Sequence, residues 1–384
     1  MSTPPTPGEL ISGRVAVQQR VLPAYRAPFF ELLAAACPDG LGLFSGAPLK
    51  EEQIRTVQDL AGVQFARGRN RYFLSPSSRF FLCWQDGLLP WLESWNPAVL
   101  VLEANPRYMS SRQAIRWMHA RGRPVLGWGL GAPPVNGVMG SLQQANRRAF
   151  LSQLDGVIAY SQRGAAEYRQ AGIPAERVYV APNSAAPRPA ASLPERSGLS
   201  SGPGRVLFVG RLQERKRLDV LFAAARLLPA ELRPEIIVVG EGPARAGFEA
   251  AAVGLKPAVR FVGEQHGEAL AAQFRQAELF VLPGTGGLAV QQALANGLPI
   301  IVAQGDGSQD DMVHPANGWQ VVPGDVPALA AALREALSDR QRLLAMGRES
   351  YRIAVEEINL EQMAAGFVGA LQTVLKLGLR SSGK

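Results

Sequence analysis

The sequence predicts an α/β protein made of two doubly wound domains, each with a parallel sheet flanked by helices. Short β-type runs alternate with amphipathic segments along the chain, which is typical of parallel sheets covered by helices. The 384 residues are too many for one ordinary domain of about 150 residues. A stretch rich in Pro, Ser, Gly and Ala, within residues 182–204, interrupts the alternation and is typical of a linker.

The predicted strands of the first half are short. The run at 99–102 is apolar throughout, as expected for a strand buried on both faces. Ser161 is expected to cap the helix that follows it, and Gly172 to end that helix. In chain order the predicted elements are strand 14–18, helix 27–36, strand 41–44, strand 99–102, helix 109–120, strand 124–128, strand 156–160, helix 162–171 and strand 178–180.

The second half repeats the alternation. A helix that starts near Leu218 has an apolar face at the 3.6-residue spacing, and Asp325 is expected to cap a helix over 326–337. The predicted strands are 205–209, 235–239, 259–262, 279–282 and 299–302.

These elements divide the chain into three parts. We predict an N-terminal domain over 1–189, a linker over 190–204 and a C-terminal domain over 205–384, with a last helix near 360–378 that packs back on the N-terminal domain. Ligands of parallel α/β sheets bind beyond the carboxyl ends of the strands. The expected site is therefore a cleft across which the two domains face each other.

The composition excludes several classes of protein. Hydrophobic residues make up 47% and charged residues 19%, which is typical of a globular protein. Two cysteines and three scattered histidines predict no disulfide framework and no metal site. We see neither a signal-peptide pattern nor an apolar run long enough for a membrane span, so we expect a cytoplasmic protein.

The positive charge is confined to the first half. Residues 1–200 contain 21 Lys and Arg against 13 Asp and Glu, whereas residues 201–384 contain 19 of each. A basic surface of this kind would suit nucleic acid, anionic lipid or a phosphorylated substrate, and a solvated surface without a partner is the alternative.

Three turns of the C-terminal domain lie where a ligand is expected, at 210–216, 240–243 and 283–288. None is a P-loop or a GxGxxG fingerprint. The third turn exposes backbone N–H groups just before a helix, which favours a phosphate, and Arg211 and Lys216 of the first turn would neutralise the same anion. The alternative is that the glycines serve the turn alone and the basic run is a solvated surface.

Taken together, five segments resemble the C-terminal domain of the retaining glycosyltransferases of family 4, which have the GT-B fold. They are 210–216, 238–243, 259–263, 282–299 and 317–325. The likeness covers most of residues 205–340. Segments 22–30 and 160–183 look, more loosely, like the acceptor-side domain of the same family.

The resemblance implies roles for particular residues. Arg211 and Lys216 would be the catalytic pair that holds the diphosphate of a nucleotide-sugar donor without a metal or cofactor. Acceptor-side candidates are Tyr25, Arg26 and Trp128, with core packing or loop bracing as the alternative. The backbone near Val262 and Gly263 would meet the base, and the amides of Gly287 and Leu288 would hold the distal phosphate. The further donor-binding residues are Gly210, Glu241, Gly284, Gly286 and Gln292.

Two positions depart from the family pattern. Gln292 stands where the family usually has a Glu that binds the ribose, and Gly284 stands where it usually has a Glu that contacts the sugar. Gln still forms hydrogen bonds, whereas Gly has no side chain. The sugar is then held by loop amides and neighbours such as Asp306, or the donor differs, or activity has been lost.

The resemblance thus implies a retaining, metal-independent hexosyltransferase that uses a UDP- or GDP-sugar. Its acceptor would be a glycan or lipid-linked glycan in cell-envelope or polysaccharide biosynthesis. The basic N-terminal half is expected to contact the anionic inner face of the membrane or a phosphate-bearing lipid carrier. The alternatives are a catalytically weak or inactive nucleotide-sugar-binding accessory protein, a hydrolase or epimerase of the same fold, and a nucleic-acid binder, although no nucleic-acid-binding module is recognised.

Overall fold

The computed structural model consists of two compact units. Unit 1 comprises Met1–Ala185 and Leu360–Lys384, and unit 2 comprises Ala186–Asn359. The structure describes residues 10–52, 54–74, 78, 81–135, 137, 139–190, 192–193, 203–305 and 307–381. Most of the predicted linker, at 191 and 194–202, therefore lies outside the described residues, as does Asp306.

Unit 1 contains a seven-stranded parallel sheet with the order β3-β2-β1-β6-β7-β8-β9. The chain builds β1, β2 and β3 toward one edge and then returns to β6 on the other side of β1. The sheet order therefore reverses between β1 and β6, where ligands of such sheets usually bind. The strands are β1 (Val15–Val21), β2 (Leu41–Gly46), β3 (Val63–Arg67), β6 (Val99–Glu103), β7 (Val125–Gly129), β8 (Gly156–Ala159) and β9 (Val178–Val180).

Helices cover both faces of this sheet because successive residues of a strand point to opposite faces. Val15 and Val17 pack with α1 and α13, whereas Ala16 packs with α2, α3, α4 and α5. The bounds are α1 (Ala27–Ala34), α2 (Leu88–Trp95), α3 (Met109–His119), α4 (Gly140–Leu151), α5 (Gln162–Gln170) and α13 (Leu360–Ser381), with short 3-10 turns η1 (Ala24–Arg26), η2 (Lys50–Glu52) and η3 (Ala175–Arg177).

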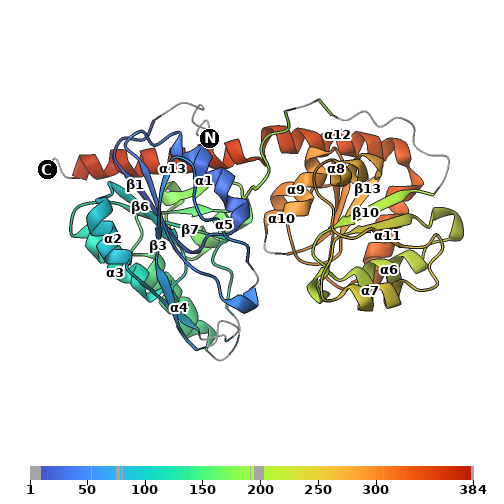
Figure 1. Ribbon diagram of the computed structural model, residues 1–384, viewed down its shortest axis with the longest axis horizontal. Coiled ribbons are helices and arrows are strands. Elements are labelled where there is room, and N and C mark those ends of the chain that lie inside the picture. The colour runs from blue at the N-terminus through green and yellow to red at the C-terminus, as the bar shows by residue number, and fades with distance from the viewer. Residues whose placement is uncertain are drawn as a thin grey trace. The chain divides into compact units, whose positions relative to one another are not determined.

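Helix α13 belongs to unit 1 although it follows unit 2 in the chain. Figure 1 shows α13, in red, beside the blue helix α1, and the two helices are in contact. Phe367 of α13 is fully buried and its ring lies 5.0 Å from that of Phe29 and 4.8 Å from that of Trp128. The core of unit 1 is therefore completed by a segment from the far end of the chain.

A two-stranded antiparallel hairpin, β4 (Arg69–Phe73) and β5 (Leu82–Asp86), also belongs to unit 1. The sequence analysis did not predict it. Its first strand carries two arginines and an asparagine in five residues, so it lacks the apolar run by which buried strands were identified.

Unit 2 contains a six-stranded parallel sheet with the order β12-β11-β10-β13-β14-β15. One apolar core unites the sheet and its helices. The strands are β10 (Arg205–Val209), β11 (Glu235–Val239), β12 (Arg260–Phe261), β13 (Leu279–Leu282), β14 (Ile300–Ala303) and β15 (Gly318–Val321). The helices are α6 (Leu218–Arg226), α7 (Arg245–Ala252), α8 (Gly267–Gln276), α9 (Leu288–Ala295), α10 (Ser308–Met312), α11 (Val326–Ser338) and α12 (Arg340–Glu356), with 3-10 turns η4 (Glu214–Lys216) and η5 (Ala230–Leu232).

The predicted fold class of two parallel α/β sheets is confirmed. Every strand predicted from the sequence is present, with ends that differ by a few residues. Both predicted helix caps are confirmed, because the Ser161 side chain accepts a hydrogen bond from Gly164 N–H at 3.0 Å and Asp325 accepts one from Ala328 N–H at 2.8 Å. No helix within the described ranges combines the length and the apolar character needed to cross a bilayer.

Candidate functional site

Three turns meet at the carboxyl edge of the sheet of unit 2. Strands β11, β10 and β13 are neighbours, so the turns that follow them lie side by side. The first two turns touch backbone to backbone: a Cβ on Gly240 would lie 2.0 Å from the carbonyl oxygen of Gly210. Leu212 and Glu241 are joined by a hydrogen bond of 2.9 Å between the N–H of Leu212 and the carbonyl of Glu241. Only glycine permits this close approach.

Lys216 is the last residue of η4, and its side chain packs against the third turn, residues 283–288. Its side chain is 9% exposed, and its ammonium group donates a hydrogen bond to the carbonyl oxygen of Thr285 at 2.6 Å. Arg215 ties the same turns together, because its guanidinium donates to the Thr285 hydroxyl at 3.1 Å and its carbonyl accepts from the Thr285 N–H at 3.1 Å. The amine of Lys216 is thus held next to the glycine-rich turn.

The surroundings of Lys216 disfavour its charged form. Burial, and then the positive charge of Arg215, lower the pKa of Lys216 to about 8. Its hydrogen bond goes to a carbonyl oxygen, which only partly compensates a positive charge. An anion placed beside it would restore the balance, so the position is suited to a phosphate.

Gly284 and Gly286 explain why the third turn carries so few side chains. A Cβ on Gly284 would lie 2.2 Å from the carbonyl oxygen of Arg215, and a Cβ on Gly286 would lie 2.5 Å from the Lys216 ammonium nitrogen. Gly286 also has φ +143°, which L-residues rarely adopt. In this backbone conformation no side chain, including the Glu usual in the family, fits at position 284.

Helix α9 begins directly after this turn, with Gly287 as its N-cap residue and Leu288 as its first residue. The buried side chain of Gln309 stabilises the third turn by donating a hydrogen bond to the carbonyl of Gly286 at 3.0 Å. The first N–H groups of a helix have no partner within the helix, and the helix dipole favours negative charge there. The amides of Gly287 and Leu288 therefore follow directly after Thr285, the residue whose carbonyl oxygen holds the ammonium of Lys216.

The other predicted donor residues lie at the same edge. Arg211 is exposed, Glu241 forms an ion pair with Arg245 of α7, and Gln292 is exposed on α9. The carbonyl of Gly263 accepts from the Gly240 N–H at 2.8 Å, which places Gly263 beside the second turn, and Val262 is bonded through its N–H to Val238 at 3.0 Å. Asp306, proposed as a neighbour of the sugar, lies outside the described residues.

The acceptor-side candidates of unit 1 differ in their access to a ligand. Tyr25 is 43% exposed, whereas Arg26 and Trp128 are 4% and 1% exposed. The guanidinium of Arg26 lies over the rings of Tyr25, Trp128 and Tyr160, with its carbon 5.3, 5.1 and 5.4 Å from the ring centres. Arg26 and Trp128 therefore brace the carboxyl edge of the sheet, and Tyr25 is the accessible member of the three.

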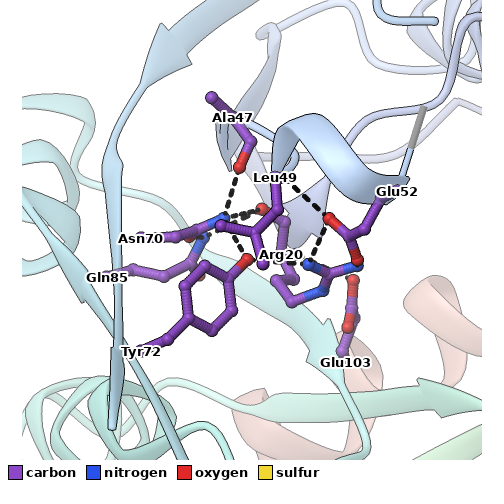
Figure 2. A network of polar contacts seen from close by, with 8 residues as sticks. All are labelled: Arg20, Ala47, Leu49, Glu52, Asn70, Tyr72, Gln85 and Glu103. Atoms are coloured by element: carbon purple, nitrogen blue, oxygen red, sulfur yellow. Dashed lines mark hydrogen bonds and ion pairs between the residues drawn. The ribbon is translucent and has the colours of Figure 1, made fainter. Parts of the chain in front are cut away.

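A polar network at the carboxyl edge of unit 1, shown in Figure 2, was not predicted from the sequence. Its centre is Arg20, at the end of β1, which forms an ion pair with Glu52 at 2.7 Å and donates to the Tyr72 hydroxyl at 2.7 Å. A sequence signal existed, because Gln18-Gln19-Arg20 is a polar triplet inside an otherwise apolar central strand. The role of Thr285 of unit 2 was also not predicted, because Lys216 binds its backbone carbonyl, a group that every residue has.

The described residues hold no group of three or more His, Cys, Asp or Glu able to bind a metal ion. The adjacent Asp310 and Asp311 lie on the short helix α10, and His119 pairs instead with Asp155 at 3.0 Å.

Comparison with known proteins finds a family model that is similar to most of unit 2. Residues 191–353 match the family model described as glycosyl transferases group 1. A sulfoquinovosyl transferase of Arabidopsis thaliana is 30% identical over 174 residues, which are 42% of this chain and 33% of the relative. A D-inositol 3-phosphate glycosyltransferase of Salinispora tropica is 34% identical over 176 residues, which are 41% of this chain and 35% of the relative. The matched segment thus spans about a third of each relative's length.

Solved structures resemble the chain over nearly its whole length. A sucrose-phosphate synthase of Thermosynechococcus elongatus aligns with a TM-score of 0.69 at 18% identity, covering 95% of this chain and 99% of the other. Anabaena HepE in complex with UDP aligns with a TM-score of 0.64 at 16% identity, covering 94% and 99%. At these identities the likeness establishes the fold. Residues 191–353 therefore resemble the glycosyl transferases group 1 family, and the chain has the GT-B fold.

Proposed function

We propose that the protein is a retaining, metal-independent glycosyltransferase that moves a hexose from a UDP- or GDP-sugar to a glycan or lipid-linked acceptor. The observation that carries this proposal is the position of Lys216, buried against the glycine-rich turn at the start of α9. The names of the two relatives describe transferases of glycosyl groups, which agrees with the proposal.

The geometry suits a reaction in which a diphosphate leaves. When the bond between the anomeric carbon and the phosphate breaks, negative charge accumulates on the leaving diphosphate. Lys216 and Arg211, together with the N–H groups of Gly287 and Leu288, would stabilise that charge more strongly in the transition state than in the bound donor. The acceptor hydroxyl attacks on the face that the diphosphate leaves, and its proton passes to the departing phosphate oxygen.

The test is the variant Lys216→Ala. We expect its transfer or donor hydrolysis rate to fall by at least about a hundredfold, the usual effect of removing one group that stabilises developing negative charge. Turnover of a panel of UDP- and GDP-sugars would be measured by release of the nucleotide diphosphate.

Lys376→Ala is the matched control, because Lys376 is exposed on α13 and lies in the other unit. It should turn over donor like the wild type. Full activity in a folded Lys216→Ala protein would disprove the role of Lys216 and with it the proposed site.

A second candidate function is favoured by one observation. The third turn has no room for a side chain at Gly284, so the sugar lacks the acidic contact usual in the family. The chain would then be an accessory protein that binds a nucleotide sugar without transferring it. Thermal stabilisation by UDP or GDP, combined with no sugar release from any donor of the panel, would establish this alternative over the enzyme.

A further inference from the structure

Strand β1 changes character at its carboxyl end. Its first residues are apolar, but Gln18, Gln19 and Arg20 follow, and both glutamines are at most 5% exposed. Central strands of parallel sheets are normally apolar throughout, since both faces are covered. Departures from such local rules concentrate at functional sites, and this one lies where the sheet order reverses between β1 and β6.

The guanidinium of Arg20 already has an anionic partner and a hydroxyl partner. It meets Glu52 with two hydrogen bonds of 2.7 and 3.1 Å and the Tyr72 hydroxyl with a third of 2.7 Å. Burial is the largest single effect and lowers the pKa of Arg20, but the interactions with Glu52, Tyr108 and Tyr72 together outweigh it, so the pKa is raised on balance. Arg20 therefore stays charged, and its charge is neutralised by Glu52 rather than offered to a ligand.

A second layer of amides holds this pair in place. The Asn70 side chain donates to the carbonyls of Arg20 and Ala47 at 2.8 and 3.0 Å, and Gln85 donates to Asn70 and to the carbonyl of Gln19 at 2.9 and 3.1 Å. Hydrogen-bonded supports of this kind fix the geometry of a site before the ligand arrives.

Glu103 is the remaining charged residue of the network and ends β6. Its carboxylate accepts the N–H of Arg20 at 2.7 Å and the hydroxyl of Tyr108. Figure 2 shows Glu52 and Glu103 on one side of Arg20, with Asn70, Tyr72 and Gln85 on the other. A carboxylate has about four acceptor positions, and two donors among the described residues reach the carboxylate of Glu103. Glu103 is also partly exposed.

A small cavity lies beside the network, over the ends of β1, β2 and β3. It measures about 100 Å³, and Ala47, whose carbonyl belongs to the network, forms part of its wall together with Leu22, Ser45, Phe65 and Arg67. Glu103 is not among the residues that line this cavity. The carboxyl edge of the sheet thus has a carboxylate with acceptor positions left and, separately, a partly apolar recess, and a sugar ring has both hydroxyl groups and apolar faces.

We propose that Glu103 is a specificity-determining residue that accepts a hydrogen bond from a hydroxyl of a neutral sugar, and that this sugar is the part of the acceptor bound by unit 1. The inference rests on the proposed function only in that it identifies the bound sugar as part of the acceptor. The residues of the site all belong to unit 1. Because Arg20 is compensated by Glu52, and Arg26 is stacked on three rings, the network favours hydroxyl donors over anions at this position.

The inference also predicts a pH dependence. Burial raises the pKa of Glu103, against the effects of the Arg20 N–H, Tyr108 and the charges of Arg20 and Arg26. The other titratable groups that sense it are Cys83 of β5 and Tyr160 after β8. Protonation turns one oxygen of the Glu103 carboxylate into a hydroxyl donor and so removes hydrogen-bond acceptor positions. Sugar binding should therefore weaken as the pH falls through the raised pKa of Glu103.

The experiment measures binding of free glucose, galactose and mannose to the full chain by saturation-transfer NMR. At least one hexose should bind the wild type. Its affinity should fall at least about tenfold in Glu103→Ala, the loss of one charge-assisted hydrogen bond. Glu103→Gln keeps the shape and one acceptor, so it should bind weakly but without the pH dependence, and it preserves the test if the alanine variant does not fold.

The matched control is Asp155→Asn. Asp155 accepts one backbone N–H, from Val125 at 2.7 Å, just as Glu103 accepts that of Arg20, but it lies at the opposite edge of the same sheet. This variant should bind the hexose like the wild type. Wild-type affinity in Glu103→Ala, an equal loss in Asp155→Asn, or no hexose binding by the wild type would each overturn the inference.

Two outcomes separate this inference from the proposed function. Lys216→Ala, which disables the donor site, should still bind the hexose through unit 1. Conversely, loss of hexose binding in Glu103→Ala with unchanged binding of UDP or GDP supports the inference even if no transfer is detected.

Discussion

The glycines at 284 and 286 allow two turns to approach each other closely enough to enclose the amine of Lys216. The segments that contain them were recognisable in the sequence, and so was Lys216, because all belong to an ordered set of motifs. The reason why position 284 must be glycine was not, since the carbonyl of Arg215 that would clash with a Cβ comes from a turn about seventy residues away. Spatial neighbours of that kind leave no trace in a single sequence.

Replacing Gly286 by alanine adds a single methyl group and tests whether this close packing positions the amine of Lys216. Gly286→Ala puts a Cβ 2.5 Å from the Lys216 amine at φ +143°, so we expect the amine to move and donor turnover to fall about a hundredfold. Gly247→Ala is the control, because nothing lies within 4 Å of its Cβ in α7. It should raise the free energy of unfolding by about 0.5–1 kcal/mol and leave turnover unchanged.

The titration of Lys216 supplies a second prediction. Its pKa is lowered to about 8 by burial and Arg215, and only the protonated amine stabilises a diphosphate. The ratio kcat/KM for the donor should therefore decline as the pH rises through about 8. A profile that is flat from pH 7 to 9.5 would contradict the charged role of Lys216.

At the level of elements, the apolar strands and the capped helices were predictable because each carries a local pattern. The β4–β5 hairpin was not, since its residues are stabilised by partners in other elements. Arg71 pairs with Asp86 across the hairpin, and Asn70 and Tyr72 bond to Arg20 of β1. The candidate network of unit 1 was missed for the same reason.

Helix α13 allows a prediction about stability. Phe367 is fully buried among aromatic rings, so Phe367→Ala should lower the free energy of unfolding by about 3–5 kcal/mol. Leu377, on the same helix, is 54% exposed. Leu377→Ala should therefore change the free energy of unfolding by less than about 0.5 kcal/mol. Urea denaturation of the two variants would measure both values, and equal values would show that α13 does not complete the core of unit 1.

At the level of the whole molecule, the uneven charge is the feature that composition alone revealed. The excess of basic over acidic residues lies within residues 1–200, which supply most of unit 1, whereas residues 201–384 are balanced. A diphosphate site needs a few placed cations, so the balanced half is compatible with the donor site proposed there.

We predict that the full chain binds phosphatidylglycerol-containing vesicles more strongly than phosphatidylcholine vesicles, and that 0.5 M salt abolishes the difference, because the attraction is between a basic surface and anionic lipid. Co-sedimentation measures the bound fraction. Equal binding to the two kinds of vesicle would contradict the expected contact with an anionic membrane and would favour an acceptor that diffuses freely.

Unit 2 is, in effect, an insertion within unit 1, and this sets the order in which the protein can be built. Residues 186–359 leave the ribosome as one continuous unit, so they can fold while synthesis continues. Unit 1 begins first but cannot bury Phe29 and Trp128 fully until Phe367 has been made. The N-terminal part of unit 1 is therefore made before unit 2 but reaches its final packing only after it, and for that interval the exposed apolar face of the first sheet would be a target for chaperones.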